Sequence, residues 1–274
     1  SIRLGTSDLV VGPIAYGCWR FAGHDLSTAG QLITTAVEQG WTLIDTADSY
    51  TMEIDGQGHN ELLIAEALKL RPTEAKNILV ATKGGLIYRT GRPWDRNGKP
   101  EYLRQAAIDS ARRLGVESIG LYQYHRQDYT VAYTDSLGAM KDLLDEGLIQ
   151  MAGISNAITE QIALFDEMLD GRLVSVQNRF SPIFQSSRPE LDYTVEHGMA
   201  FLPWGLTESH FFERDRVGRI VPALAGSGER WGLCVGEDAA VEVDLATGDL
   251  VGVSVSESLL VDAAHARRDG AVWL

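Results

Sequence analysis

The most constraining feature of this 274-residue sequence is a repeated alternation of short apolar runs, rich in Val, Ile and Leu, with longer amphipathic stretches. A short apolar run indicates a buried strand, and an apolar stripe at helical spacing indicates a helix packed against a sheet. Strands and helices that alternate in this way are typical of a parallel sheet, because parallel neighbours need a crossover connection. The sequence therefore predicts an α/β protein.

Seven strands and six helices are predicted before Gly205. The strands are expected in residues 12–19, 42–48, 77–85, 118–125, 148–156, 173–181 and 199–205, and the helices in residues 27–40, 59–70, 100–115, 133–147, 159–171 and 188–198. Ser27 with Gln31 has nearly N-cap spacing, and Thr159 precedes an apolar stripe. Helix ends are predicted at Gly40, Gly115, Gly147, Gly171 and Gly198.

Polar and ionisable residues stand at the ends of these predicted strands. They are Asp45 to Tyr50, Lys83, His125, Ser155, Asn156, Gln177 and Trp204. A closed (β/α)8 barrel brings all of its strand ends to one mouth, whereas an open doubly wound sheet would not gather all of these residues. The glycine-rich motif of open dinucleotide-binding sheets is also absent after the first strand. We therefore expect a (β/α)8 TIM-barrel type fold with seven clear βα units.

Composition narrows the classes of partner and the compartment. A formal charge of −14 and a pI near 4.8 argue against nucleic acid, since phosphate contacts need a basic surface. No basic-then-apolar leader precedes SIRLGTSDL, and no uncharged run approaches the roughly 18 residues that span a bilayer. We expect a cytoplasmic protein without a membrane partner, and the sequence leaves the oligomeric state open. Cys18 and Cys234 are expected to be buried thiols, without a disulfide or a metal site.

Three residues at the predicted mouth form a chemically coherent set. A phenol has a pKa of about 10 and is a poor proton donor at neutral pH unless a neighbour favours its anion. The Lys83 ammonium would favour the phenolate of Tyr50, and the Asp45 carboxylate would keep the ammonium charged and oriented. His125 would hold a carbonyl oxygen against this acid. The set suits protonation of an oxygen while a nicotinamide delivers hydride to its carbon.

Each of these residues also has a structural interpretation. Asp45 and Asp48 could cap the following segment, and we prefer that interpretation for Asp48 alone. Taken singly, Lys83 would be a solvated rim charge and His125 a hydrogen-bonded structural residue. The remaining polar residues have structural alternatives too: a turn for Ser155 and Asn156, a satisfied core amide for Gln177 and core packing for Trp204. For Lys83 and His125, joint placement with Asp45 and Tyr50 favours the catalytic interpretation.

Six strand-end motifs carry a resemblance to a known family. They are LIDTADSY, ATKGG, LYQYHRQD, GISN, VQNRFSP and FLPWG. In order and spacing they resemble the motifs of the aldo-keto reductase family, over residues 2 to 205. The opening RLGTSDLVVGPIAYGCW also resembles the N-terminal hairpin and first strand of that family, and GHNELLIAEAL its second helix.

The resemblance implies a role for each candidate residue. Tyr50 would be the general acid, tuned by Asp45 and Lys83, and His125 would orient the substrate carbonyl. The carboxamide of nicotinamide would be held by Ser155, Asn156 and Gln177, and its ring would stack on Trp204. The resemblance also implies NADPH as the cofactor and a small carbonyl compound as the substrate.

Residues 206–274 do not continue the alternation of predicted strands and helices. The stretch 206–225 is predicted to be a basic amphipathic helix, and the strand-rich remainder contains a hairpin turn, DLATGDL, between AAVEV and VGVSV. We expect RWGLCVG or LVGVSV to fill the place of an eighth strand. The usual segment for the adenosine phosphates is not visible, and Arg214, Arg216 and Arg219 would have to replace it.

The tail resembles the C-terminal part of cyanophycinase and dipeptidase E type serine peptidases. His210 matches a triad histidine of that family, but no Gly-x-Ser-x-Gly elbow occurs in the chain, so a surface position at a helix start is the better interpretation of His210. The sequence therefore predicts a junction near Gly205, with a reductase-like barrel in residues 1–205 and an atypical, chimeric region in residues 206–274 that completes or is appended to it.

The expected function is NADP(H)-dependent reduction of an aldehyde or ketone, with a proton from Tyr50. The alternative is a catalytically silent, truncated or chimeric barrel that no longer binds cofactor and acts through protein contacts. Peptidase activity is a distant third hypothesis. Tyr88, Arg89 and Trp94 lie in a long insert and predict a substrate wall, although a solvated loop remains an alternative.

Overall fold

The computed structural model describes residues 1–19, 25–51, 56–89, 94–180 and 185–204, and after them only the backbones of six short strands. The chain forms two compact units. The first comprises Ser1–Asn178 with Ser187–Leu202, and the second comprises Arg179–Ser186 with Pro203–Leu274. Each unit is described by itself below. Among the described residues, no helix is both long enough and apolar enough to cross a membrane.

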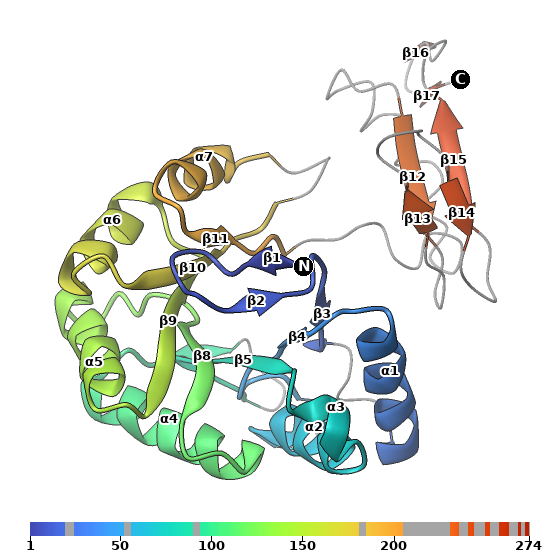
Figure 1. The fold of residues 1–274 in the computed structure, drawn as a ribbon. Coiled ribbons are helices and arrows are strands. Elements are labelled where there is room, and N and C mark those ends of the chain that lie inside the picture. The colour runs from blue at the N-terminus through green and yellow to red at the C-terminus, as the bar shows by residue number, and fades with distance from the viewer. Residues whose placement is uncertain are drawn as a thin grey trace. The chain divides into compact units, whose positions relative to one another are not determined.

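The first unit is built on a curled parallel sheet of seven strands (Figure 1). In spatial order they are β3 (Ala15–Gly17), β4 (Leu43–Asp45), β5 (Leu79–Gly84), β8 (Ile119–Tyr124), β9 (Ile149–Ser155), β10 (Leu173–Gln177) and β11 (Ala200–Phe201). All seven lie within the predicted strands and follow the chain order of a barrel. In the described part of the chain β3 and β11 are the two edges of the sheet. The α/β barrel-type fold is therefore confirmed.

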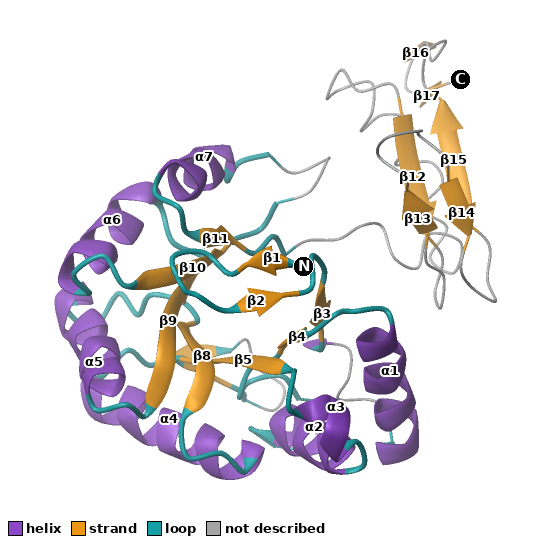
Figure 2. Cartoon of the chain, in the orientation of Figure 1, coloured by secondary structure: helices purple, strands orange, loops and turns teal. Residues whose placement is uncertain are grey.

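Helices follow the strands and lie along the outside of the curled sheet (Figure 2). They are α1 (Leu26–Glu38), α2 (His59–Lys69), α4 (Pro100–Leu114), α5 (Tyr133–Asp145), α6 (Thr159–Met168) and α7 (Arg188–Glu196). All six predicted helices are confirmed. The sequence did not predict the single turn α3 (Pro72–Ala75), which is too short to show a periodic pattern.

The predicted helix ends are correct, but one predicted cap is wrong. All five glycines named as helix ends have φ between 71° and 78°, the left-handed region that favours glycine. At the start of α1 the cap is Asp25 rather than Ser27, because the Asp25 carboxylate accepts a hydrogen bond of 2.7 Å from the backbone N–H of Thr28. Thr159 is the first residue of α6, and Ile158 occupies the cap position.

Two small hairpins flank the sheet. Strands β1 (Ile2–Arg3) and β2 (Val10–Val11) pair antiparallel, as the predicted N-terminal hairpin requires. Strands β6 (Leu86–Ile87) and β7 (Asp95–Arg96) also pair antiparallel, within the insert that was expected to form a substrate wall. The described part of that insert therefore contains a hairpin, whose second strand is exposed.

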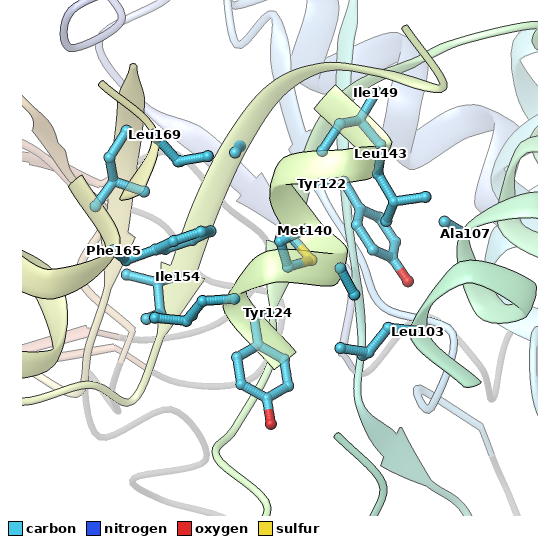
Figure 3. Packing of buried hydrophobic residues seen from close by; sticks show 14 of the residues in the cluster. Leu103, Ala107, Tyr122, Tyr124, Met140, Leu143, Ile149, Ile154, Phe165 and Leu169 are labelled. Carbon is cyan, nitrogen blue, oxygen red and sulfur yellow. The ribbon is translucent and has the colours of Figure 1, made fainter. Parts of the chain in front are cut away.

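The strands divide their side chains between two cores. On β8, Tyr122 and Tyr124 pack outward against the helices, whereas Leu121 belongs to an inner cluster with Leu43 and Ala81. Figure 3 shows the outer cluster, which includes Leu103 of α4, Met140 and Leu143 of α5, and Phe165 of α6. Alternate residues of a strand point to opposite faces of the sheet. The polar residues of these strands therefore also divide between an inward and an outward face.

The second unit contains three antiparallel strand pairs. They are β12 (Trp231–Val235) with β15 (Ser258–Asp262), β13 (Val241–Val243) with β14 (Leu250–Gly252), and β16 (Arg268–Asp269) with β17 (Val272–Trp273). The pairing of β13 with β14 confirms the predicted hairpin. Among the described strands, RWGLCVG and LVGVSV thus pair with other tail strands, so neither is seen in the eighth place of the sheet. The helix predicted at 206–225 lies outside the described residues.

Candidate active site

Lys83 is the centre of a buried polar cluster at the carboxyl ends of β4 and β5. Its ammonium donates to Oδ2 of Asp45 at 2.9 Å, to Oη of Tyr50 at 3.1 Å and to the carbonyl oxygen of Thr46 at 2.7 Å. Lys83 is 1% exposed, and Asp45 is also buried. The three hydrogen bonds use all three protons of the ammonium and fix its direction.

Strand register explains why residues so distant in sequence meet. In the parallel pair of β4 and β5, Asp45 lies opposite Ala81, and in the next pair Lys83 lies opposite Gln123. Ala81 belongs to the inner cluster, and Lys83 stands two residues further along the same strand, so both point inward. Gln123 points inward as well, and its Nε2 lies 3.4 Å from Oδ1 of Asp45. The sequence analysis missed Gln123, although its period-two spacing from Leu121 was the available signal.

The charge state of this cluster differs in part from the expectation. Burial lowers the pKa of Lys83, but Asp45 and Tyr50 raise it by more, so the ammonium stays charged. Burial raises the pKa of Tyr50, and the lowering effect of Lys83 does not overcome it. The expectation that the ammonium makes the phenol more acidic than usual is therefore wrong as a net effect, because burial of the phenolate outweighs it.

His125 lies beside Tyr50 at the end of β8. The two rings meet edge to face with their centroids 5.8 Å apart, and Nδ1 of His125 is 3.5 Å from Oγ of Ser49. Burial, together with the charges of Lys83 and Arg126, holds the pKa of His125 well below its usual range. A neutral imidazole in this position can donate a hydrogen bond to a carbonyl oxygen without competing as an acid.

Ser155, Asn156 and Gln177 also meet, where β9 and β10 end. The Ser155 hydroxyl donates to the carbonyl of Gln177 at 2.8 Å, and Nδ2 of Asn156 donates to Oγ of Ser155 at 2.9 Å and to the carbonyl of His125 at 3.0 Å. Asn156 has φ of 57°, a left-handed conformation that asparagine tolerates better than most residues. The structure therefore brings together three of the four residues expected to contact nicotinamide.

Trp204, the fourth, belongs to the second unit. Its carbonyl accepts a hydrogen bond of 2.9 Å from the backbone N–H of Phe180, and it forms a parallel bridge with Arg179 in the same unit. Its role as a stacking platform stays a prediction.

Two tryptophans extend the site outward from Tyr50. The ring of Trp19 lies 6.3 Å from that of Tyr50, and the ring of Trp94 lies 6.1 Å from that of Trp19. Trp94 was expected in a substrate wall, whereas Trp19 was not singled out, although it is the last residue of the first predicted strand. Arg89 pairs with Asp95 at 3.0 Å across the β6–β7 hairpin. This hairpin and the loop after β8 line a pocket of about 480 Å³.

Asp48 does not cap a helix as predicted. It is 1% exposed and its carboxylate accepts a hydrogen bond of 2.9 Å from Nε2 of Gln57, while α2 begins much later, behind Gly58. The same nitrogen lies 3.1 Å from the carbonyl of Leu86, and Oε1 of Gln57 accepts from the backbone N–H of Tyr88. Gln57 thus joins the loop that carries Tyr50 to the β6–β7 hairpin.

A larger cavity than the pocket lined by the β6–β7 hairpin lies away from the candidate residues. It has a volume of about 1040 Å³ and is lined by residues that include Thr42, Leu79 and Ile119, at the amino ends of the strands. None of the candidate catalytic residues lines it. The convergence of ionisable groups at the carboxyl ends, rather than cavity size, therefore locates the candidate active site.

Comparison with known proteins identifies the group to which this fold and these residues belong. A sequence model of the aldo/keto reductase family matches residues 13–221. The chain belongs to the aldo/keto reductase family. The matched region continues past Gly205, where the sequence suggested a junction.

Cys18, on the edge of the site, is buried as predicted, whereas the side chain of Cys234 lies outside the described residues.

Members of this family are similar to the chain in sequence and in structure. A 6-dehydroglucose reductase of Novosphingobium aromaticivorans is 33% identical over 209 residues, which are 74% of this chain and 67% of the relative. The holo form of an aldo-keto reductase from Bacillus halodurans superposes with a TM-score of 0.64 at 28% identity, covering 80% of this chain and 68% of the other. A glycerol dehydrogenase of Gluconobacter oxydans gives 0.65 at 26%, covering 79% and 65%.

These comparisons extend to about two thirds of the length of the relatives. They do not support the resemblance of residues 206–274 to cyanophycinase and dipeptidase E type peptidases. His210, the position that carried that resemblance, lies outside the described residues, as do Arg214, Arg216 and Arg219.

Proposed function

We propose that the chain reduces a small aldehyde or ketone to an alcohol with NADPH, and that Tyr50 supplies the proton. One observation carries the proposal: the buried Lys83 ammonium is bonded at once to the Tyr50 hydroxyl and to the Asp45 carboxylate. A structural ion pair would not require a phenol as its third member. Membership in a family of oxidoreductases supports the same chemistry.

The residues at the ends of β9 and β10 fit the carboxamide of a nicotinamide. Both protons of the Asn156 amide and the Ser155 hydroxyl proton are already donated to protein acceptors. Oδ1 of Asn156 accepts one bond and keeps a second lone pair for a carboxamide N–H. The side-chain amide of Gln177, the last residue of β10, would donate to the carboxamide oxygen. A bound nicotinamide would supply the hydride.

The protein itself would deliver the proton. The neutral His125 ring donates a hydrogen bond to the substrate carbonyl and holds its oxygen near Tyr50. As negative charge develops on that oxygen, the Tyr50 proton moves to it, and Lys83 stabilises the phenolate that remains. Asp45 keeps Lys83 charged and correctly placed throughout. The rim formed by Trp19 and Trp94 would contact the rest of the substrate.

The names of the similar proteins guide the choice of substrates. One is a reductase of 6-dehydroglucose and another is a glycerol dehydrogenase, so sugar-derived aldehydes and small hydroxyketones are the first compounds to try. The preference for NADPH over NADH rests on the family resemblance, since the residues expected at the adenosine end lie outside the described part of the chain.

Titration of the purified chain with NADPH, and separately with NADH, tests the proposal through quenching of its six tryptophans. Saturation at micromolar NADPH, together with oxidation of NADPH by a carbonyl substrate, is the expected result. No saturation by either nucleotide would overturn the proposal and favour a silent barrel that has kept its catalytic residues but lost its cofactor.

A further inference from the structure

We propose that Arg126 is a positioning residue that fixes the side-chain amide of Asn156 and, through it, the nicotinamide carboxamide. The inference rests on the proposed function and adds to it a residue that the catalytic set does not include. Its basis is a hydrogen bond of 2.9 Å from Nη2 of Arg126 to Oδ1 of Asn156.

Arg126 determines which end of the amide faces the cofactor. A guanidinium can only donate, so it binds the oxygen of an amide and never its nitrogen. The nitrogen of Asn156 must then face the opposite side, where it meets the carbonyl of His125 and the hydroxyl of Ser155. When Arg126 is present, rotating the Asn156 amide by 180° also breaks the bond to the guanidinium. Without Arg126 that cost disappears, so either the oxygen or the nitrogen of the amide could face a carboxamide.

The backbone at Asn156 is already fixed by other bonds. Its N–H donates to the carbonyl of Gln177 at 3.0 Å, and its left-handed φ of 57° leaves few conformational alternatives. The free variable is therefore the side chain, and Arg126 is the group that restrains it. A charged donor makes this restraint stronger than a neutral one would.

The surroundings of Arg126 indicate that its role is not that of an ion-pair partner. Among the described residues no carboxylate lies within salt-bridge distance of it, while its neighbour Arg96 carries the same charge. Burial and Arg96 together lower the pKa of Arg126, which still remains a cation because a guanidinium is so basic. Placing a half-buried cation next to another cation costs free energy. The presence of Arg126 here therefore indicates a use for the hydrogen bond that it makes.

Arg126 also follows His125 directly, so one segment serves both halves of the site. The His125 ring lies against Tyr50, and its carbonyl accepts from Asn156. Restraining Asn156 through Arg126 therefore ties the position of the nicotinamide ring to that of the carbonyl group held by His125. Hydride and proton would then reach the substrate from fixed directions.

The test compares Arg126→Met with Arg104→Met, a control in which the lost arginine pairs with Glu146 on the helix surface. Affinity is measured for NADPH and for 2′,5′-ADP, which lacks the nicotinamide. Arg126→Met should weaken NADPH binding by roughly tenfold, since one charge-assisted hydrogen bond is involved, and leave 2′,5′-ADP binding unchanged. The control should change neither. Equal loss for both ligands, or loss for neither, would overturn the inference.

Two further readouts separate positioning from a structural role. With NADPH carrying deuterium on one face of C4, the wild-type chain should transfer hydrogen from one face only. Arg126→Met should transfer hydrogen from both faces. In an Asn156→Gly background Arg126→Met should have no added effect, whereas additive effects would contradict action through Asn156. If Arg126→Met does not fold, Arg126→Lys keeps the charge and should give intermediate NADPH affinity; wild-type affinity and selectivity in it would refute the need for the guanidinium. Failure of the wild-type chain to bind NADPH would instead reject the proposed function.

Discussion

The ammonium of Lys83 and the carboxylate of Asp45 lie 2.9 Å apart on neighbouring strands, and almost no solvent reaches Lys83. Removing both charges from water is costly, and their attraction offsets that cost only while both are present. The pair is therefore a weak source of stability but a strong constraint: neither residue can be changed alone without leaving a buried charge. Selection for stability alone would favour apolar residues in this place, so the pair itself argues for a chemical role.

Lys83→Met is expected to abolish most turnover and also to destabilise the fold. Loss of the ammonium leaves Asp45 unpaired, which costs about 3–5 kcal/mol in buried pairs. Urea unfolding of the single variant and of the double variant Asp45→Asn/Lys83→Met separates the two effects. The double variant should recover most of the stability and none of the activity. Recovered turnover would show that Lys83 serves the fold and not the chemistry.

Tyr50→Phe should lower kcat by about 10²- to 10⁴-fold, the usual contribution of a general acid, while the Kd for NADPH stays nearly unchanged. The substitution removes only the hydroxyl bonded to Lys83 and keeps the ring that packs against Trp19. Stopped-flow measurement of NADPH oxidation gives kcat, and tryptophan quenching gives the Kd. Wild-type turnover in this variant would rule out Tyr50 as the proton donor.

The low pKa of His125 predicts a stability that falls in acid. In the unfolded chain the imidazole protonates near pH 6.5, whereas in the fold its burial and the charges of Lys83 and Arg126 oppose protonation. Below about pH 6.5 the unfolded chain therefore binds more protons, and the free energy of unfolding decreases. The raised pKa of Asp48 acts in the opposite direction, so a matched variant is needed.

His125→Gln is that variant, because it keeps a polar side chain and removes the titration. Between pH 7.5 and pH 5.5 the wild-type chain should lose about 1.4 kcal/mol more than the variant in urea unfolding, the value expected from an unfolded pKa near 6.5. Equal losses would show that His125 becomes protonated in the folded state.

Gln57→Leu should raise KM for the carbonyl substrate by roughly tenfold without weakening NADPH binding, since it cuts the hydrogen bonds between the Tyr50 loop and the β6–β7 hairpin. Tyr102→Phe is the matched control. It removes the hydroxyl that lies 3.2 Å from the same Nε2 and leaves the bonds to the hairpin intact. A similar KM in the two variants would contradict a role for Gln57 in placing the hairpin.

The sequence predicted the grouping of residues better than their energetics. Strand-end positions were enough to bring Asp45, Tyr50, Lys83 and His125 together, because parallel strands deliver their carboxyl ends to one side of a curled sheet. The side chains that hold them depend on tertiary contacts without a local signature. Asp48 accepts from a residue nine positions away in the chain, so its carboxylate looked like an ordinary cap.

Burial also explains why the expected lowering of the Tyr50 pKa was wrong. Whether the pKa of Tyr50 rises or falls depends on a balance between loss of solvent and the Lys83 charge, and no sequence pattern reports that balance. The proposed division into residues 1–205 and 206–274, the cytoplasmic location and the contact of Trp204 with nicotinamide remain predictions, because nothing in the described units tests them.

Tyr122→Phe should raise the free energy of unfolding by about 1 kcal/mol. The Tyr122 hydroxyl is fully buried and has no hydrogen-bond partner among the described residues, so its removal relieves a desolvation cost and keeps the ring packed in the outer core.

A Cβ at Gly84, next to Lys83, would overlap this same hydroxyl. Gly84→Ala should therefore be severely destabilising alone and much less so together with Tyr122→Phe. Thermal unfolding of the two single variants and the double variant measures the coupling, and strict additivity would mean that overlap with the Tyr122 hydroxyl is not the cause of the destabilisation by Gly84→Ala.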